Sequence, residues 1–165
     1  MRMPNTVPAH RSALRYVLLL AFILRLPGKP CCYNRPMKKQ SGKIIIPSGV
    51  NVWPHEYQTA QSLADAGYVV EFIRKSDLPR ERSADAFLDG EKHEFKAPKS
   101  AKLSAVEDNL KKASRQASNI VFDSRRMKRV PDKAIERELI TQLEKSRVIT
   151  RIVFINRHGI VIEIR

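Results

Sequence analysis

The sequence has few cysteines and lacks an apolar segment of transmembrane length. Its two cysteines, Cys31 and Cys32, are adjacent, and residues 42–165 contain none. Adjacent cysteines do not make a zinc site, and a cysteine-free segment implies neither a disulfide framework nor an oxidising compartment. The apolar run at residues 16–24 is shorter than the roughly 20 residues that a membrane-spanning helix needs. These absences leave an apolar core as the expected source of stability.

Residues 1–41 also lack acidic side chains, although they carry eight lysines or arginines. A basic start followed by an apolar run resembles a secretory leader, yet no Ala-x-Ala cleavage site follows it. We predict that residues 1–41 are an extension and linker, leader-like or disordered. A leader, a membrane-associating segment and an upstream extension of the reading frame all fit, so the sequence leaves the localisation open. Residues 42–165 are enough for one core and one domain.

Basic residues outnumber acidic residues, 31 against 17, which gives a formal net charge of +14. Outside residues 1–41 the excess falls to 23 against 17, and it still favours a phosphate backbone as the partner. The densest basic run, residues 125–129, lies in a predicted loop and is either a phosphate-binding segment or a solvated loop. No aromatic interleaving indicates single-strand stacking, so backbone contacts are expected rather than base stacking.

The most informative motif is a predicted hairpin around Asp89 and Gly90. Both central positions of a type I′ turn need positive φ, and this dipeptide is a strong signal for that turn. With these two residues in the turn, Asp85 falls opposite Glu94 on one face, and strand alternation adds Lys96 to the same face. The other predicted pairs are Leu88 with Glu91, Phe87 with Lys92, and Ala86 with His93.

Two opposed carboxylates with a neighbouring lysine suit metal-assisted cleavage of a phosphodiester. Like charges at this distance are unfavourable unless one is protonated or a cation lies between them. Mg²⁺ prefers one or two carboxylates, with water and substrate phosphate completing its shell, and a lysine can neutralise charge that develops on the phosphate. The alternative is a solvent-facing ion cluster that contributes under about 1 kcal/mol.

Other elements flank this hairpin in a definite order. A helix is expected at residues 53–66, a strand at 68–73, a helix opened by a capping box at Ser104 to Glu107, and a buried strand at 119–122. A packing helix at 131–146 and a closing hairpin at 151–164 follow. The helical stripes that we expect to pack are Trp53, Tyr57, Ala60 and Ala64 in the first helix, and Val106, Leu110, Ala113 and Ala117 in the second.

This order resembles the PD-(D/E)xK nuclease superfamily, whose motif would be Asp85 followed by Glu94, Phe95 and Lys96. The chain also resembles the C-terminal tRNA-nuclease toxin domains of CdiA-type contact-dependent growth inhibition proteins, over about residues 43–165. Ala84 stands where the superfamily name has proline, a position that varies widely. The resemblance implies an α/β (α+β) fold with a restriction-endonuclease-like core, helix-strand-strand-strand-helix-strand, and an added C-terminal helix and β-hairpin.

The resemblance also implies roles for particular residues. Asp85 and Glu94 would hold a divalent cation, Mg²⁺ or Mn²⁺ or another, and Lys96 would be the catalytic lysine. Glu56 would complete the metal site from the first helix. The alternative for Glu56 is an N-terminal helix acid that favours the macrodipole.

Substrate contacts are expected from polar residues farther along the chain. Gln116 and Arg115 would hydrogen-bond phosphate or the lysine, and Arg125 and Arg126 would contact the nucleic-acid backbone. Arg115 is equally explained as a polar helix end in solvent. Strand parity turns His93 away from the proposed site, so we expect it to be structural.

Two classes of function remain open at this point. One is a metal-dependent endonuclease of toxin type, with tRNA favoured and DNA as the alternative; the other is a catalytically silent nucleic-acid-binding module. Retention of Asp85, Glu94 and Lys96 together favours the nuclease. Such a toxin would act in a cytoplasm, after delivery to a target cell in the toxin reading, and would need an inhibitory partner, expected to be acidic by charge complementarity.

Overall fold

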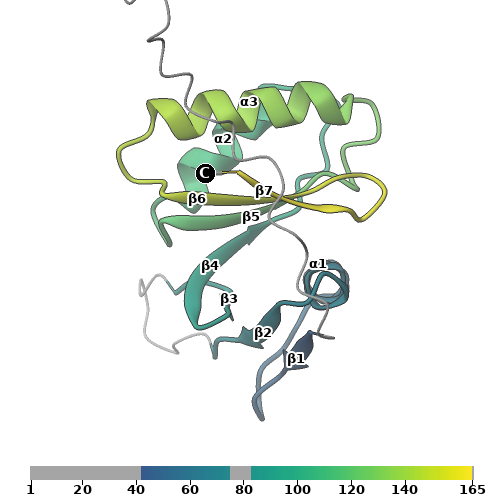
Figure 1. Ribbon diagram of the computed structural model, residues 1–165, viewed down its shortest axis with the longest axis vertical. Coiled ribbons are helices and arrows are strands. Elements are labelled where there is room, and N and C mark those ends of the chain that lie inside the picture. Colours follow the sequence, from purple (N-terminus) through teal and green to yellow (C-terminus); the bar gives the residue numbers. More distant parts are fainter. Residues whose placement is uncertain (1–41, 75–82, 165) are drawn as a thin grey trace, which may run out of the picture. The chain divides into compact units, whose positions relative to one another are not determined.

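A computed structural model describes residues 42–74 and 83–164, so the expectations for residues 1–41 lie outside the part described. The described residues form three helices and one seven-stranded sheet, and they confirm the expected mixed α/β class (Figure 1). None of the described helices has the length and apolar character needed to cross a membrane. The elements are β1 (Lys43–Ile45), α1 (Pro54–Asp65), β2 (Val69–Phe72), β3 (Ala86–Leu88), β4 (Glu91–Lys96), α2 (Ala105–Ala113), β5 (Asn119–Asp123), α3 (Asp132–Lys145), β6 (Arg151–Ile155) and β7 (Val161–Ile164).

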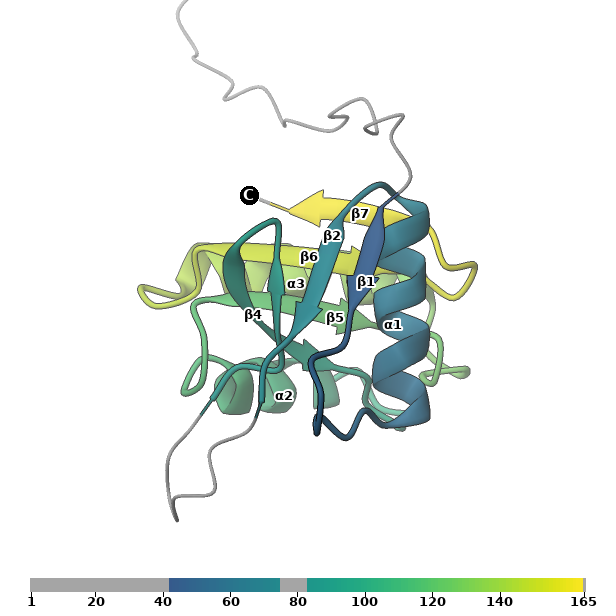
Figure 2. The ribbon, with the colours of Figure 1, turned by 90° about the horizontal axis from the view of Figure 1, so that it is seen from below.

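The strands lie in the sheet in the same order as in the chain. β2, β3 and β4 form an antiparallel meander, while β4, β5 and β6 are parallel and are joined through α2 and α3. β7 closes the sheet antiparallel to β6, and β1 adds a parallel edge beside β2. α1 lies beside β1 and β2, whereas α2 and α3 pack behind β5 and β6 (Figures 1 and 2).

Strand alternation divides the apolar side chains between two layers. In β5, Ile120 and Phe122 pack with α2 and α3, while Val121 packs with the α1 layer. The same alternation in β4 sends Phe95 into the α1 layer. Glu94 and Lys96 must therefore face the α2 side of the sheet, because successive side chains in a strand point to opposite faces.

The hairpin between β3 and β4 has the predicted register. Ala86 pairs with His93, Phe87 with Lys92, and Leu88 with Glu91. Asp89 and Gly90 have φ of 50° and 85°, as a type I′ turn requires. Asp89 also fixes the turn to β2, since its backbone N–H donates to Val69 O and its Oδ1 accepts from Val69 N, both at 2.9 Å.

Two predicted helix details are wrong. Ser104 makes no side-chain cap, because its own backbone is already helical, and Glu107 instead pairs with Lys111 one turn later. The apolar stripe of α1 is also split, since Ala60 and Ala64 are buried but Trp53 is 63% exposed and Tyr57 is 45% exposed. The short edge strand β1 was not predicted.

Gly42 enters β1 at a point where no side chain fits. Its N–H donates to Ala64 O at the end of α1, at 3.0 Å. A Cβ at this position would lie 2.3 Å from Tyr68 O and 2.4 Å from Ala64 O, so any other residue would push the backbone apart. Gly42 therefore sets how closely β1 approaches α1 and the start of β2.

Replacement of Gly90 by alanine should destabilise the domain through the backbone alone. A Cβ at Gly90 would meet no atom within 4 Å, so there is no clash to relieve. The cost of holding alanine in the left-handed region is about 1–2 kcal/mol. Urea denaturation should show this loss for Gly90→Ala and a smaller one for Gly90→Asn, and equal midpoints for wild type and Gly90→Ala would contradict the turn assignment.

Candidate active site

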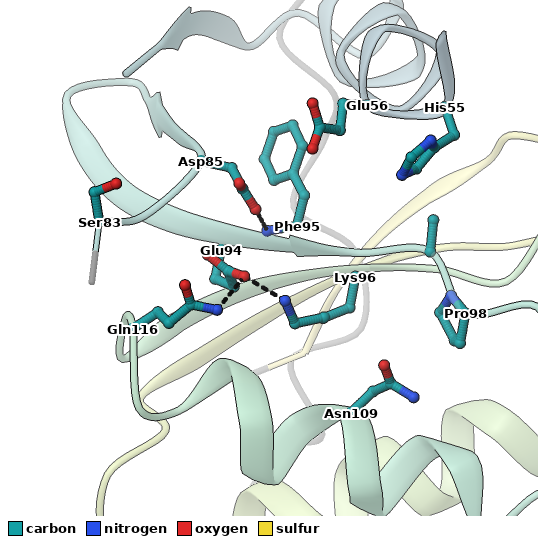
Figure 3. Close-up of a pocket in the computed structure, with 11 residues that line it drawn as sticks. His55, Glu56, Ser83, Asp85, Glu94, Phe95, Lys96, Pro98, Asn109 and Gln116 are labelled. Carbon is teal, nitrogen blue, oxygen red and sulfur yellow. Dashed lines mark hydrogen bonds and ion pairs between the residues drawn. The ribbon is translucent and has the colours of Figure 1, made fainter. Parts of the chain in front are cut away.

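One open polar pocket of about 570 Å³ lies where the carboxyl end of β4 passes between α1 and α2 (Figure 3). Strand β4 and the loop after it form its floor, α1 and α2 border it from either side, and the residues just before β3 close it. The lining residues are His55, Glu56, Ser83, Asp85, Glu94, Phe95, Lys96, Ala97, Pro98, Asn109 and Gln116.

Glu94 is the most buried acid in this pocket, at 2% exposure. Its Oε1 accepts hydrogen bonds from Gln116 Nε2, at 2.6 Å, and from the Lys96 ammonium (Figure 3). Its Oε2 is buried and has no hydrogen-bond partner. Oε1 thus accepts two hydrogen bonds, while Oε2 is buried and accepts none.

Asp85 lies next to Glu94, as the hairpin register predicts. The backbone N–H of Asp85 donates to His93 O at 3.2 Å, and the Asp85 Oδ2 accepts from Phe95 N at 2.9 Å. Burial raises the pKa of Glu94 to about 7. The Lys96 ammonium lowers this pKa. Asp85 raises it further, through its charge and through a hydrogen bond that needs one of the two carboxyls to be protonated. Burial therefore favours the protonated form of Glu94 up to about neutral pH, whereas the neighbouring Lys96 ammonium favours the carboxylate.

Lys96 completes the group on the α2 side of the sheet. Its ammonium forms an ion pair with Glu94, and its side chain is 20% exposed against 3% for that of Glu94. The lysine side chain is thus more exposed than the carboxylate with which it pairs, and both line the pocket. The structure brings together Asp85, Glu94, Lys96 and Gln116, all four of which the sequence proposed.

Glu56 lines the pocket but performs a second task. Its Oε2 accepts from the backbone N–H of Trp53 at 3.0 Å, which caps the first turn of α1. In the described part of the chain, no three side chains of aspartate, glutamate, histidine or cysteine lie close enough together to hold a metal ion. Glu56 therefore caps the first turn of α1, and the described residues show no three-carboxylate cluster of Glu56 with Asp85 and Glu94.

The arginines proposed as substrate contacts do not line this pocket. Arg115 is exposed near the end of α2, and Arg126 donates to Ala97 O at 3.1 Å. Arg125 turns inward and binds the buried Asp123 through its Nε, 3.0 Å from both carboxylate oxygens. The guanidinium also reaches Ser62 Oγ on α1 at 3.0 Å.

This buried ion pair positions the border of the pocket. Thr59 of α1 donates through its hydroxyl to Asp123 Oδ2 at 2.7 Å and to His55 O at 3.0 Å. A chain of contacts therefore runs from β5 to the first turn of α1. Arg125 thus anchors α1 to the sheet at Ser62, about two helical turns from His55 and Glu56, which line the pocket.

Three polar lining residues were missed in the sequence: His55, Ser83 and Asn109. His55 precedes Glu56 in the first turn of α1, and Asn109 faces the pocket from α2 while its Nδ2 donates to Ala105 O at 2.7 Å. The helical period gives a signal for Asn109, because it lies seven residues, about two turns, before Gln116. No local pattern distinguishes His55.

His93 points to the opposite face, as predicted from strand parity. It is fully buried, and its Nδ1 lies 2.8 Å from Glu91 O, so this nitrogen must donate. Burial lowers its pKa. His93 takes no part in the pocket.

The described residues thus form a mixed α/β domain that presents two carboxyls, a lysine and an amide in one polar pocket. Residues 82–161 match the family model described as the contact-dependent growth inhibition CdiA C-terminal domain. The matched range includes Asp85, Glu94, Lys96 and Gln116 but not α1.

A solved structure shares the fold. It is the CdiA-CT/CdiI toxin and immunity complex from Burkholderia pseudomallei, which the chain matches with 21% sequence identity and a TM-score of 0.55, over 74% of this chain and 98% of that chain. No curated protein matches the chain. The expected similarity to CdiA toxin domains is confirmed for residues 82–161 by the family model and for the fold by the solved structure.

The raised pKa of Glu94 predicts that this residue destabilises the metal-free protein as the pH rises. The unfolded carboxyl ionises near 4.5 and the folded one near 7, so between these values the folded state binds more protons. The contribution of Glu94 to the free energy of unfolding should therefore fall by roughly 3 kcal/mol from pH 4.5 to pH 7.

Comparison with Glu94→Gln isolates this contribution, because the lowered pKa of His93 acts in the opposite direction and is common to both proteins. In urea denaturation with EDTA, the free energy of unfolding of Glu94→Gln should rise relative to that of wild type between pH 5 and pH 8. A difference between the two proteins that does not change with pH would contradict the raised pKa.

Proposed function

We propose that the chain is a CdiA-type toxin domain that acts as a metal-dependent endonuclease of the PD-(D/E)xK superfamily and hydrolyses phosphodiester bonds, with tRNA as the favoured substrate. The observation that carries the proposal is the convergence of Asp85, Glu94 and Lys96 in one polar pocket. The family model that residues 82–161 match, and the toxin named in the similar structure, support the toxin reading.

The pocket fits a divalent cation bound through two carboxylates. Glu94 Oε2 is buried without a hydrogen-bond partner, and burial, to which Asp85 adds, raises the pKa of Glu94. A bound cation would favour the ionised carboxylate instead. Mg²⁺ commonly takes one or two carboxylates and leaves its other positions to water and phosphate, so the missing third acid is no obstacle. A bound Mg²⁺ or Mn²⁺ would supply Lewis-acid activation of the phosphate and of a water molecule.

The protein's own groups have separable roles in this proposal. The Lys96 ammonium lies at the pocket surface, where it would neutralise negative charge that develops on the phosphate. Gln116 donates to Glu94 Oε1 and would hold this carboxylate in place. Glu56 and the Asp123–Arg125 pair hold the first turn of α1 at the border of the pocket.

The substrate class follows from charge and from family resemblance. The formal net charge of +14 favours a polyanion, and an electrostatic attraction of this kind does not distinguish RNA from DNA. The resemblance to CdiA toxin domains favours tRNA, and DNA is the alternative that the same experiment addresses.

An active nuclease toxin also requires an inhibitory partner in the cell that makes it. The similar structure is a complex of a toxin with its immunity protein. We propose a cognate immunity protein for this chain, acidic where it faces the basic toxin.

Substitution of Lys96 by alanine should abolish cleavage while binding is retained. Removal of one donor to a developing charge typically costs about 100-fold or more in rate. The assay is incubation of the chain with total tRNA, single-stranded DNA and plasmid, each in Mg²⁺, Mn²⁺ or EDTA. Asp85→Asn and Glu94→Gln should also lose activity, with weaker metal binding in calorimetry, and EDTA should stop the wild type.

Lys92→Ala is the matched control. Lys92 has the same strand and the same side-chain parity as Lys96, but it is exposed and does not line the pocket. Retained activity in Lys96→Ala, Asp85→Asn and Glu94→Gln would remove the nuclease assignment. Binding without cleavage by wild type, with every metal tested, would favour the silent nucleic-acid-binding module.

Expression of the wild-type chain should slow bacterial growth, and expression of Lys96→Ala should not, because the toxicity depends on the same chemistry. Nucleic acids from these cultures identify the substrate: tRNA fragments with intact DNA support the tRNA proposal, and DNA breaks with intact tRNA support the alternative. Equal growth with equal amounts of soluble protein would contradict the toxin proposal.

A further inference from the structure

Asn109 is a polar residue of the pocket that the proposed chemistry does not use. It lines the pocket from α2, and its amide lies on the same side of β4 as Lys96, with the oxygen turned toward the strand (Figure 3). Its Nδ2 donates to Ala105 O at 2.7 Å, one turn back along the helix. A carbonyl oxygen can only accept, so the NH2 group must face Ala105 and the Oδ1 must face away from it. A contact within α2 thus fixes the orientation of this amide.

The Oδ1 of Asn109 is an open hydrogen-bond acceptor. Its side chain is half-buried, and none of the described residues donates to this oxygen. Gln116, just beyond the end of α2, is arranged in the same way. Its Nε2 donates to Glu94 Oε1 at 2.6 Å, and within the described ranges nothing donates to its own Oε1. The wall of the pocket on the α2 side therefore presents amide oxygens, because both NH2 groups already have acceptors.

An open acceptor in such a pocket suits the sugar of a nucleic acid and not its phosphate. A phosphodiester has oxygens and no hydrogen to donate, so it pairs with the Lys96 ammonium and gains nothing from the Asn109 oxygen. The sugar is bonded directly to the phosphate, so a pocket that holds the phosphate also holds the sugar next to it. Ribose carries a 2′-hydroxyl that can donate to Oδ1, whereas deoxyribose has no donor at this position.

We propose that Asn109 Oδ1 accepts a hydrogen bond from a ribose 2′-hydroxyl of the bound strand, and that Asn109 is the residue by which the pocket prefers RNA to DNA. The inference rests on the proposed nuclease function and deepens it, because the net charge attracts both nucleic acids alike. Lys96 acts on the phosphate, and Asn109 acts on the sugar beside it. Bond cleavage and the choice of substrate are therefore assigned to different residues.

Binding of three oligonucleotides with one uracil-containing tRNA sequence tests the proposal apart from cleavage. The full chain with Lys96→Ala is titrated in Mg²⁺ with strands made of ribose, of 2′-deoxyribose or of 2′-fluororibose. Fluorine keeps an electronegative group on the sugar but cannot donate a hydrogen bond. The ribose strand should bind at least about threefold to tenfold more tightly than the other two, as expected for one hydrogen bond between neutral groups. Equal affinity for the ribose and 2′-fluororibose strands would overturn the proposal.

A double-mutant cycle assigns this preference to Asn109. Asn109→Leu has nearly the same size and no acceptor, so it should weaken binding of the ribose strand and leave the 2′-fluororibose strand nearly unchanged. Asn109→Asp keeps an acceptor oxygen and adds a negative charge, so it should weaken all three strands and keep the preference for ribose. Equal weakening of the three strands by Asn109→Leu would overturn the assignment to the sugar.

Ser114→Ala is the matched control. Ser114 also donates to a carbonyl of α2, Lys111 O at 3.1 Å, but it does not line the pocket. This variant should keep both the affinity for the ribose strand and the preference over the 2′-fluororibose strand. Loss of the preference in Ser114→Ala would show that any change in α2 removes it, and would overturn the specific role of Asn109.

The outcomes separate this inference from the function on which it rests. If wild type cleaves RNA and DNA with the same kcat/KM, the role of Asn109 is wrong and the nuclease stands. If wild type neither binds nor cleaves any nucleic acid, both proposals fail together.

Discussion

The two-residue turn at Asp89 and Gly90 determines how Asp85, Glu94 and Lys96 lie relative to one another in the pocket. Because both residues adopt positive φ, β3 and β4 pair in one register only. A slip by one residue would send Glu94 to the α1 layer, where Phe95 now packs, and would expose Phe95 to the pocket. The apolar layers on both faces of the sheet therefore oppose any other register. The pocket is a consequence of the same packing that stabilises the fold.

Within that register, the polar groups of the pocket oppose the stability that the core provides. Glu94 is almost fully buried next to Asp85, and burial raises its pKa to about 7. Lys96 and Gln116 compensate only one of its two oxygens. Elsewhere, by contrast, buried charge is paired, as Asp123 is with Arg125. Incompletely compensated charge concentrated in one cavity is typical of functional sites.

The features that could be predicted from the sequence were those that depend on neighbours in the chain. The hairpin register, the order of helices and strands, and the common face of Asp85, Glu94 and Lys96 follow from turn chemistry and strand alternation. The inward turn of Arg125 depends on α1, 63 residues earlier, and so left no local pattern. The exposure of Trp53 likewise depends on how α1 packs on the sheet. From the sequence alone, an aromatic residue at helical spacing is predicted to lie in the core.

Gly42 gives the domain a defined point of attachment. The chain enters β1 where the end of α1 and the start of β2 leave no room for a side chain. The pocket lies at the other end of α1, a helix of 12 residues, or about 18 Å. Whatever sequence precedes Gly42 therefore joins the domain a helix length away from Lys96 and Glu94. A substitution at Gly42 would therefore disturb the contact between β1 and the end of α1, far along this helix from His55 and Glu56 at the border of the pocket.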